Sequence, residues 1–355
     1  MRIQRPLAAG AALTAVALAV QLAPAAAQDG AATTVMAKGL NNPRGVQFGP
    51  DGALYVAEAG RGGPTCIKDA GCFGLSGSIA RVSAGGTVKR VVTRLASGAE
   101  GGLFAGGATD VTFDTRGRMV TIVNGLPPAR AIPARVRRQG ARVARVTYRT
   151  FRPFARLDQI ENRLNPDKQD RNPNPYGIER LGDTYYAIDA GGNTVIAIRR
   201  SQESVAAVIP NPARRVQPVP TAITTGPDGA LYVSELAPGN NVGQVIRLVP
   251  GQQPTVVADK LPSATGISVA ADRTIYLSIF GSGGEEPRPK TGSILRIAPD
   301  GTKSTIVRGL NFPAGSAIGA DGDLYVANSS VMPGRAAPAG PFKGLSGEIV
   351  KVDLP

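Results

Sequence analysis

The chain repeats one short unit six times, and this repeat constrains the fold more than any other feature of the sequence. The fullest copies read GLNNPRGVQFGPDGALYVAEAG and GLNFPAGSAIGADGDLYVANS. The six copies occupy residues 39–60, 107–125, 174–191, 219–236, 261–281 and 309–329. A repeat of this kind predicts an array of small cores, so 355 residues can fold without one very large core.

Each copy contains two short strands joined by a tight turn. In the first copy, residues 45–48 and 53–57 have a strand-forming composition, and they flank Pro50, Asp51 and Gly52. Asp and Gly favour such a turn because Gly takes the positive φ angle at no steric cost. The copies therefore predict hairpins.

Two further strands lie between successive copies, for example at residues 293–297 and 304–308. Strands in succession without helical patterns indicate an antiparallel all-β fold, and only residues 157–164 could hold a short helix. We therefore predict a six-bladed β-propeller with four strands in each blade. A sandwich or a jelly roll is the alternative, but neither predicts a sixfold repeat.

The two ends of the chain predict how the ring closes. Only one outer strand, at residues 347–352, follows the last copy, whereas residues 33–38 form an unassigned strand before the first copy. Pairing these strands in the sixth blade removes the open edges that a ring would otherwise leave. We expect residues 28–355 to form one propeller domain, closed by its N-terminal strand.

The N-terminus has the features of an export signal. Arg2 and Arg5 precede an apolar stretch at residues 7–22, and three alanines at residues 25–27 offer a cleavage site. The apolar stretch is too short and too rich in alanine for a membrane span. We expect residues 1–27 to be a signal peptide and the mature protein to be secreted, without stable membrane insertion.

The chain contains two cysteines, Cys66 and Cys72, and no histidine. In an exported chain such a close pair predicts a loop disulfide. The absence of histidine excludes a Ser-His-Asp triad and a His-ligated zinc site. Histidine-dependent lyase chemistry is excluded on the same ground.

The formal net charge is +14, and part of it lies in one arginine stretch without an acidic residue. Its arginines are Arg130, Arg135, Arg137, Arg138, Arg142, Arg145, Arg149, Arg152 and Arg156. For a secreted protein this charge predicts an anionic cell-surface polymer or a membrane surface as partner, not nucleic acid. The alternative is a solvated strand face on a basic protein. We expect a monomer.

Polar residues follow the second strand of several copies, at the predicted mouth of the central channel. These positions are Glu58, Asn124, Asp189, Glu235, Phe280 and Asn328, and Arg44, Asp110 and Tyr176 precede inner strands at the same face. Oxygen ligands from several blades suit Ca²⁺ or another divalent metal, with Glu58, Asn124, Asp189 and Glu235 as candidate ligands. A metal-free site for a small polar molecule is a second possibility.

A structural role is the third possibility for these residues. In the run Asp189-Ala-Gly-Gly-Asn193, the Asp and Asn side chains can bond the loop backbone between two strands. Paired carboxylates could act as acid and base, and Glu58 with Asp110 or Glu235 are the candidates for that chemistry. We assign no catalytic residue.

The chain resembles the ScyD/ScyE family, which is related to NHL-type six-bladed propellers. The resemblance rests on Asn-Pro-Arg-Gly and Pro-Asp-Gly-Ala-Leu-Tyr-Val-Ala-Glu-Ala-Gly in the first copy, on the cysteine loop, and on Asn-Pro-Tyr-Gly at residues 174–177. It implies a secreted propeller and no particular activity. The fold is also similar to gluconolactonase-like propellers, which hold a divalent metal at the mouth.

We therefore expect a secreted binding or scaffold propeller. The alternative is a gluconolactonase-like, metal-dependent hydrolase that acts at the channel mouth. An enzyme needs at least three convergent oxygen ligands and an acid or base, whereas a binding module needs only a complementary surface.

Overall fold

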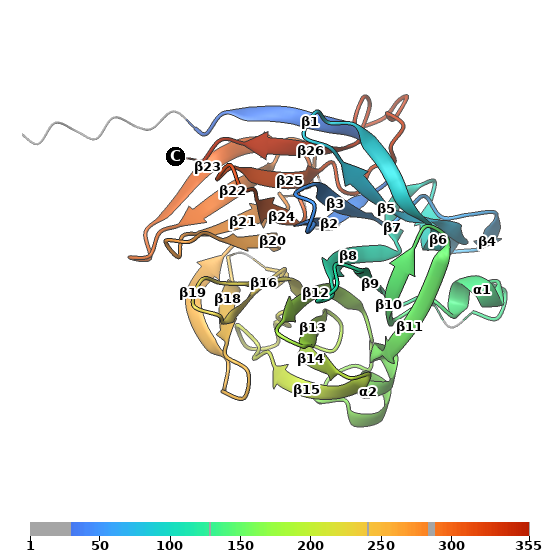
Figure 1. Cartoon of the computed structure of the whole chain (residues 1–355), viewed down its shortest axis with the longest axis horizontal. Coiled ribbons are helices and arrows are strands. Elements are labelled where there is room, and N and C mark those ends of the chain that lie inside the picture. Colours follow the sequence, from blue (N-terminus) through green and yellow to red (C-terminus); the bar gives the residue numbers. More distant parts are fainter. Residues whose placement is uncertain (1–29, 128, 240, 283–287, 355) are drawn as a thin grey trace, which may run out of the picture.

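Six small antiparallel sheets surround a central channel in the computed structural model (Figure 1). The structure describes residues 30–127, 129–239, 241–282 and 288–354, so the expected signal peptide lies outside the described residues. In each blade the four main strands are ordered from an innermost strand at the channel to an outermost strand at the rim. This arrangement confirms the six-bladed β-propeller.

The blades follow the chain in order around the ring. Blade one holds β2 (Pro43–Phe48), β3 (Leu54–Glu58), β5 (Gly71–Val82) and β6 (Val88–Glu100), with the short strands β4 (Thr65–Ile67) and β7 (Leu103–Gly106) added. Blade two holds β8 (Ala108–Phe113), β9 (Met119–Val123), β10 (Arg142–Thr147) and β11 (Thr150–Arg156). Blade three holds β12 (Pro175–Leu181), β13 (Thr184–Asp189), β14 (Thr194–Arg199) and β15 (Gln202–Val208).

The remaining blades have the same four-stranded plan. Blade four holds β16 (Pro220–Thr225), β17 (Leu231–Glu235), β18 (Gly243–Leu248) and β19 (Thr255–Leu261). Blade five holds β20 (Ala264–Val269), β21 (Ile275–Ile279), β22 (Gly292–Ile297) and β23 (Lys303–Leu310). Blade six holds β24 (Ser316–Ile318), β25 (Leu324–Asn328), β26 (Gly347–Val352) and, as its outer strand, β1 (Thr33–Leu40).

The N-terminal strand closes the ring, as expected. β1 pairs antiparallel with β26 from Thr33 opposite Val352 to Leu40 opposite Gly347, and the two strands lie side by side in Figure 1. Blade six therefore contains both ends of the propeller. Its outer strand extends two residues beyond the predicted range of 33–38.

Six of the nine hydrophobic clusters among the described residues lie between neighbouring blades, one for each pair. Between blades six and one, for example, Leu54 and Val56 pack with Tyr325 and Ala327. Each cluster is small, but every blade packs against a neighbour on both sides. This explains how a long chain forms one ring from short strands.

The repeated Asp-Gly turns are held by the tyrosine that follows four residues later. In three blades the Asp carboxylate accepts a hydrogen bond from this tyrosine and pairs with a cation of the third strand. The sets are Asp51, Tyr55 and Arg81; Asp228, Tyr232 and Arg247; and Asp321, Tyr325 and Lys351. These acids therefore have a structural role at the turns.

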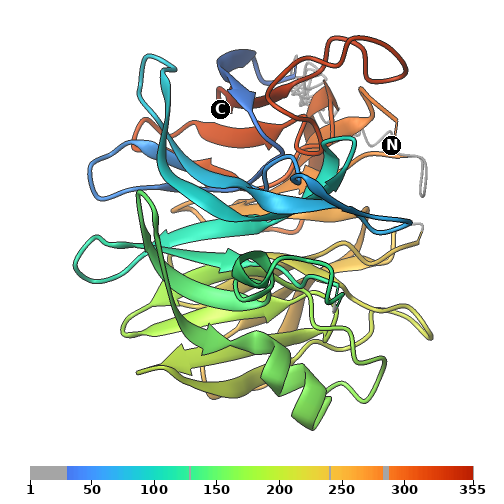
Figure 2. The same cartoon turned by 90° about the vertical axis from the view of Figure 1, so that its right-hand side faces the viewer.

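The two faces of the ring differ. The Asp-Gly turns lie on one face, which we call the turn face, and the longer connections lie on the other, the long-loop face (Figure 2). The long-loop face carries the β4–β5 hairpin, the short helices α1 (Ala134–Arg137) and α2 (Leu157–Leu164), and residues 329–346. The expected helix at residues 157–164 is thus confirmed, but the prediction that no other segment forms a helix was wrong, because α1 lies in the connection between β9 and β10.

The cysteine pair forms the expected disulfide. Cys66 and Cys72 are bonded, and they face each other across the β4–β5 hairpin. Among the described residues, no helix is long and apolar enough to cross a membrane.

Candidate functional site

The acids expected at the channel mouth lie at the ends of second strands. The β-sheet register aligns Glu58, Val123, Asp189, Glu235 and Ile279 with the first residue of each inner strand. Asn124 and Phe280 therefore lie one residue past the equivalent position. The predicted positions in blades two and five are therefore wrong by one residue, and the equivalent position holds an apolar residue in both.

Glu58 points between blades one and six, not into the channel. Its side chain is fully buried and accepts hydrogen bonds from the Asn41 N–H at 2.7 Å and the Ser78 hydroxyl at 2.6 Å. Arg90 of β6 donates to the same carboxylate at 2.7 Å and to the Gly39 carbonyl at 2.8 Å. Glu58 thus joins the closing strand β1 to blade one.

Asp189 and Asn328 have a similar local role in blades three and six. One oxygen of Asp189 accepts the N–H groups of Asn174, Gly191 and Gly192. Asn328 accepts the Asn311 N–H at 2.8 Å and donates to Glu348 at 2.8 Å. Both side chains therefore fix the loop that leads into an inner strand.

Asn193 also bonds the loops around it. Its carbonyl oxygen accepts the Val219 N–H at 3.2 Å, and its amide donates to Asp167 at 2.7 Å and Gln217 at 3.3 Å. This is the loop-bonding arrangement that the sequence left open for Asp189 and Asn193.

Glu235 has the fewest hydrogen-bond partners of the strand-end acids. One oxygen accepts the Gln244 N–H at 3.0 Å, and the other has no partner among the described residues. Burial raises the pKa of this carboxyl to about 8. Glu58, Asn124, Asp189 and Glu235 belong to four different blades, and in the described parts of the chain no three acidic or cysteine side chains form a metal-coordinating group.

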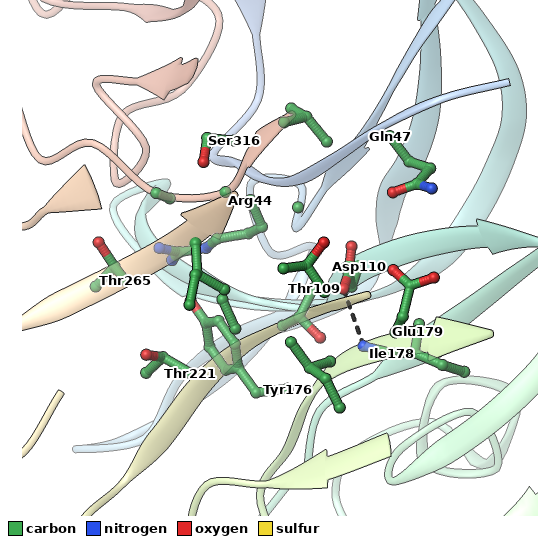
Figure 3. Close-up of a pocket in the computed structure, with 18 residues that line it drawn as sticks. Arg44, Gln47, Thr109, Asp110, Tyr176, Ile178, Glu179, Thr221, Thr265 and Ser316 are labelled. Atoms are coloured by element: carbon green, nitrogen blue, oxygen red, sulfur yellow. Dashed lines mark hydrogen bonds between the residues drawn. The ribbon is translucent and has the colours of Figure 1, made fainter. Parts of the chain in front are cut away.

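Arg44, Asp110 and Tyr176 do line the central channel (Figure 3). The inner strands of the other three blades contribute Thr221, Thr265 and Ser316. The enclosed cavity measures about 40 Å³, which accommodates only a few water-sized molecules. Arg44 donates to the Ala105 carbonyl at 2.9 Å.

Asp110 breaks the repeat at a position where the other blades have Gly45, Gly177, Ala222, Gly266 and Gly315. It accepts the N–H groups of Ile178 at 2.9 Å and Val111 at 2.8 Å. A Cβ at Gly45 would collide with this carboxylate, so the acid needs a glycine in the neighbouring blade.

Burial, with a smaller contribution from the charge of Glu179, raises the pKa of Asp110 to about 7. Burial also raises the pKa of Glu179 to about 7. Glu179 was not predicted as a channel residue, although its place in an inner strand, three residues after Tyr176, could have indicated it. The channel therefore holds two carboxyl groups that titrate near neutral pH.

A much larger hollow opens on the long-loop face between blades two and three. Its volume is about 650 Å³, within the range of ligand pockets, and we call it the arginine groove. Its lining includes Arg137, Arg142, Arg171, Asp158, Asn162 and Asn174. A second hollow of about 540 Å³, lined by Phe73, Leu103 and Phe104, shares residues 125–127 with it.

One of the three groove arginines is already neutralised. Arg142 is half-buried, donates to Asp158 at 2.9 Å, and has its pKa lowered by burial. Arg137 and Arg171 are exposed, and neither forms a salt bridge with a described residue. The groove therefore presents two guanidinium groups without a salt bridge to a described residue, and Arg137 donates its Nε–H to the Ile132 carbonyl at 2.9 Å.

The arginine stretch is divided by the fold. Arg130, Arg135, Arg137 and Arg138 lie in the connection between β9 and β10 on the long-loop face, whereas Arg145, Arg149, Arg152 and Arg156 lie along the outer strands β10 and β11 or the turn between them. Arg145 lies over the Phe154 ring and 3.6 Å from Asp114. The outer half thus behaves as a solvated strand face.

Comparison with known proteins identifies the fold and no family. No protein-family model matches the chain, and no curated protein matches it in sequence. A streptogramin B lyase structure is similar with a TM-score of 0.53 at 15% identity, over 92% of this chain and 98% of that one.

Two sugar-related propellers are similar to the same degree. A gluconolactonase from Xanthomonas campestris has a TM-score of 0.54 at 12% identity, over 92% of this chain and 90% of that one. A glucose dehydrogenase has a TM-score of 0.54 at 12% identity, over 91% of this chain and 100% of that one. These identities show a shared fold alone: the chain is a six-bladed β-propeller protein.

Proposed function

We propose that this protein is a secreted binding propeller whose ligand is anionic and occupies the arginine groove. The observation that carries the proposal is the contrast between the two cavities: the groove measures about 650 Å³ and the central channel about 40 Å³. Of these two cavities, the groove has room for a ligand of ordinary size and the channel does not.

The charge of the groove favours an anionic ligand. Arg137 and Arg171 form no salt bridge with a described residue, and the formal net charge of +14 of the full sequence adds a long-range attraction for anions. Guanidinium groups bind carboxylates and phosphates with two parallel hydrogen bonds. Asn162 and Asn174 offer further donors and acceptors.

The shape of the surface favours a polymer over a compact molecule. The groove continues past residues 125–127 into the apolar hollow beside the disulfide hairpin. A ligand that fills both hollows is extended and carries its charges at one end or at intervals. An anionic cell-surface polymer has this form, and the resemblance to the ScyD/ScyE family agrees with export.

The test is binding of alginate, a polyuronate, to the purified protein, with neutral dextran as the control polymer. We expect Arg137→Ala with Arg171→Ala to weaken alginate binding by roughly tenfold or more, since each lost charge contact contributes about 1 kcal/mol. Raising the salt concentration should weaken wild-type binding steeply.

The matched control is Arg116→Ala with Arg273→Ala, two exposed arginines in turns on the opposite face. It removes the same formal charge. Equal loss in both double variants would show that net charge alone attracts the polymer, and the groove assignment would fail.

The second candidate is a hydrolase at the channel, and one observation favours it. Asp110 and Glu179 both have a pKa of about 7, as an acid–base pair requires, and Arg44 and Tyr176 lie beside them. The narrow cavity opposes it, because a sugar lactone needs the inner strands to separate. Lactone hydrolysis that is lost in Asp110→Asn would establish this function in place of binding.

A further inference from the structure

Helix α2 turns a carboxylate towards the interior, behind the arginine groove. Glu161 is only 1% exposed, and neither of its carboxylate oxygens has a hydrogen-bond partner among the described residues. An unpaired buried carboxylate is costly, because burial removes the water that would otherwise solvate it. Such a group needs a proton or a cation.

A second buried carboxylate lies next to it. Asp189 is fully buried, and its Oδ1 accepts three backbone N–H groups, whereas its Oδ2 has no partner in the described structure. A Cβ built on Gly192 would lie 2.5 Å from Oε2 of Glu161 and 3.4 Å from Cγ of Asp189. The two acids therefore meet across the space that this glycine leaves open.

The neighbouring groups add oxygens and negative charge. A Cβ on Gly191 would collide with the carbonyl oxygen of Asn172, so this carbonyl also faces the glycine pair. Asp167 is held nearby by Asn193 at 2.7 Å. Burial and the charges of Asp167 and Asp189 disfavour the ionised form of Glu161, whereas the guanidinium of Arg171 and the N–H of Asn172 favour it.

We propose that a divalent cation of the calcium class binds between Glu161 and Asp189. The two oxygens of Glu161 and Oδ2 of Asp189 are direct ligands, the Asn172 carbonyl is a further one, and water completes the six to eight oxygens that Ca²⁺ takes. Asp167 stays outside the ligand set, because Asn193 and Gln169 already engage its carboxylate.

The charges of the other strand-end acids, Glu58 and Glu235, can be balanced without a metal ion. Glu58 has Arg90 as its counter-ion, and Glu235 is a single carboxyl that a proton can neutralise. Glu161 and Asp189 together carry two charges without a cationic hydrogen-bond partner. The cation would fasten α2 and residues 165–174, which form one wall of the arginine groove, to blade three.

The test uses the purified protein, freed of metal with a chelator and kept at pH 8. CaCl₂ is titrated by calorimetry, and thermal unfolding is followed with and without Ca²⁺; NaCl of equal ionic strength and MgCl₂ are the comparisons. We expect saturable Ca²⁺ binding and a rise in Tm of about 5 °C at a hundredfold excess over Kd.

The variants separate this site from any other. Glu161→Gln keeps the size of the side chain and removes its charge, and we expect it to weaken Ca²⁺ binding at least about tenfold while the metal-free protein stays folded. Glu235→Gln also removes a buried carboxyl with an unpartnered oxygen, and it should bind Ca²⁺ as the wild type does. Wild-type protein without Ca²⁺ binding at pH 8, or Glu161→Gln with unchanged affinity, would overturn the proposal. Alginate binding plays no part in these readouts, so failure of the groove proposal is seen separately.

Discussion

Blades one and three place a buried carboxylate at the same strand end and treat its charge in opposite ways. In blade one, Arg90 reaches from the outer strand to Glu58. In blade three, α2 brings Glu161, a second carboxylate, towards Asp189. The repeat therefore determines where the acid lies, and the elements added around each blade determine what balances it.

The same contrast applies to what projects from each blade. The hairpin of blade one is closed by its own disulfide, whereas α2 before blade three places its Glu161 beside Asp189. One insertion is thus complete by itself. The other needs a proton or a cation to be stable.

The largest effect should come from breaking the ion pair of blade one. Arg90→Ala leaves Glu58 fully buried without a counter-ion and also removes the bond to Gly39 of the closing strand. We expect a loss of about 3 kcal/mol in unfolding free energy, measured by denaturant titration near pH 7. The control is Lys89→Ala, an exposed residue of the same strand. Equal effects of the two variants would mean that Arg90 does not compensate Glu58.

The next effect concerns Glu235, which has neither a counter-ion nor a second acid. Its pKa is about 8 in the folded protein and 4.5 in the reference state, so folding favours the protonated form. The contribution of this carboxyl to stability is greatest below pH 4.5 and is lost as the pH rises towards 8. Glu235→Gln should therefore be more stable than the wild type at pH 8, by roughly 3 kcal/mol, and similar to it near pH 4.5.

The measurement is the free energy of unfolding of both proteins between pH 4 and 9. Glu100→Gln, at an exposed carboxyl, is the control and should follow the wild type throughout. A difference between Glu235→Gln and the wild type that does not change with pH would contradict the burial of an ionisable group.

The ring could be predicted from sequence because each of its parts repeats. The sixfold repeat, its Asp-Gly turns and the unassigned strand before the first copy led to six blades and their closure. The direction of the strand-end side chains could not be predicted in the same way. The register shifts between the first pairs of most inner strands, as between Pro43 and Val46 in β2, and a shift of one residue turns a side chain to the other face.

The site behind α2 was partly visible in the sequence. Glu161 follows Leu157 by four residues and Ile160 by one, so it lies on the buried face of the predicted helix. Its meeting with Asp189 was not visible, because Glu161 lies in the connection between β11 and β12 whereas Asp189 ends β13, and only the fold brings them together. The arginine groove could not be predicted either, because the sequence does not show which arginines lie in the connection between β9 and β10 and which lie along the outer strands.

A smaller effect should follow from filling the space between the two acids of blade three. Gly192→Ala introduces a Cβ against Glu161 and Asp189, which costs about 2 kcal/mol by overpacking. It should also abolish any Ca²⁺-dependent rise in Tm, since the carboxylates can no longer approach a common ion. Gly182→Ala is the control for glycine replacement in the same blade, because its Cβ meets nothing, although its positive φ adds some strain.

The smallest effect should come from removing the disulfide of blade one. The bond closes a loop between residues six apart in a hairpin at the edge of the long-loop face, so it restricts the unfolded chain little. Its hairpin is also held by the β4–β5 pairing, and the core clusters between blades do not contain either cysteine. Cys66→Ser with Cys72→Ser should lower the unfolding free energy by about 1 kcal/mol, less than Arg90→Ala in the same blade. Denaturant titration of oxidised, reduced and double-variant protein measures this. A double variant that unfolds as readily as Arg90→Ala would show that the hairpin belongs to the cooperative core of the ring, and the contrast between the two insertions would then have to be abandoned.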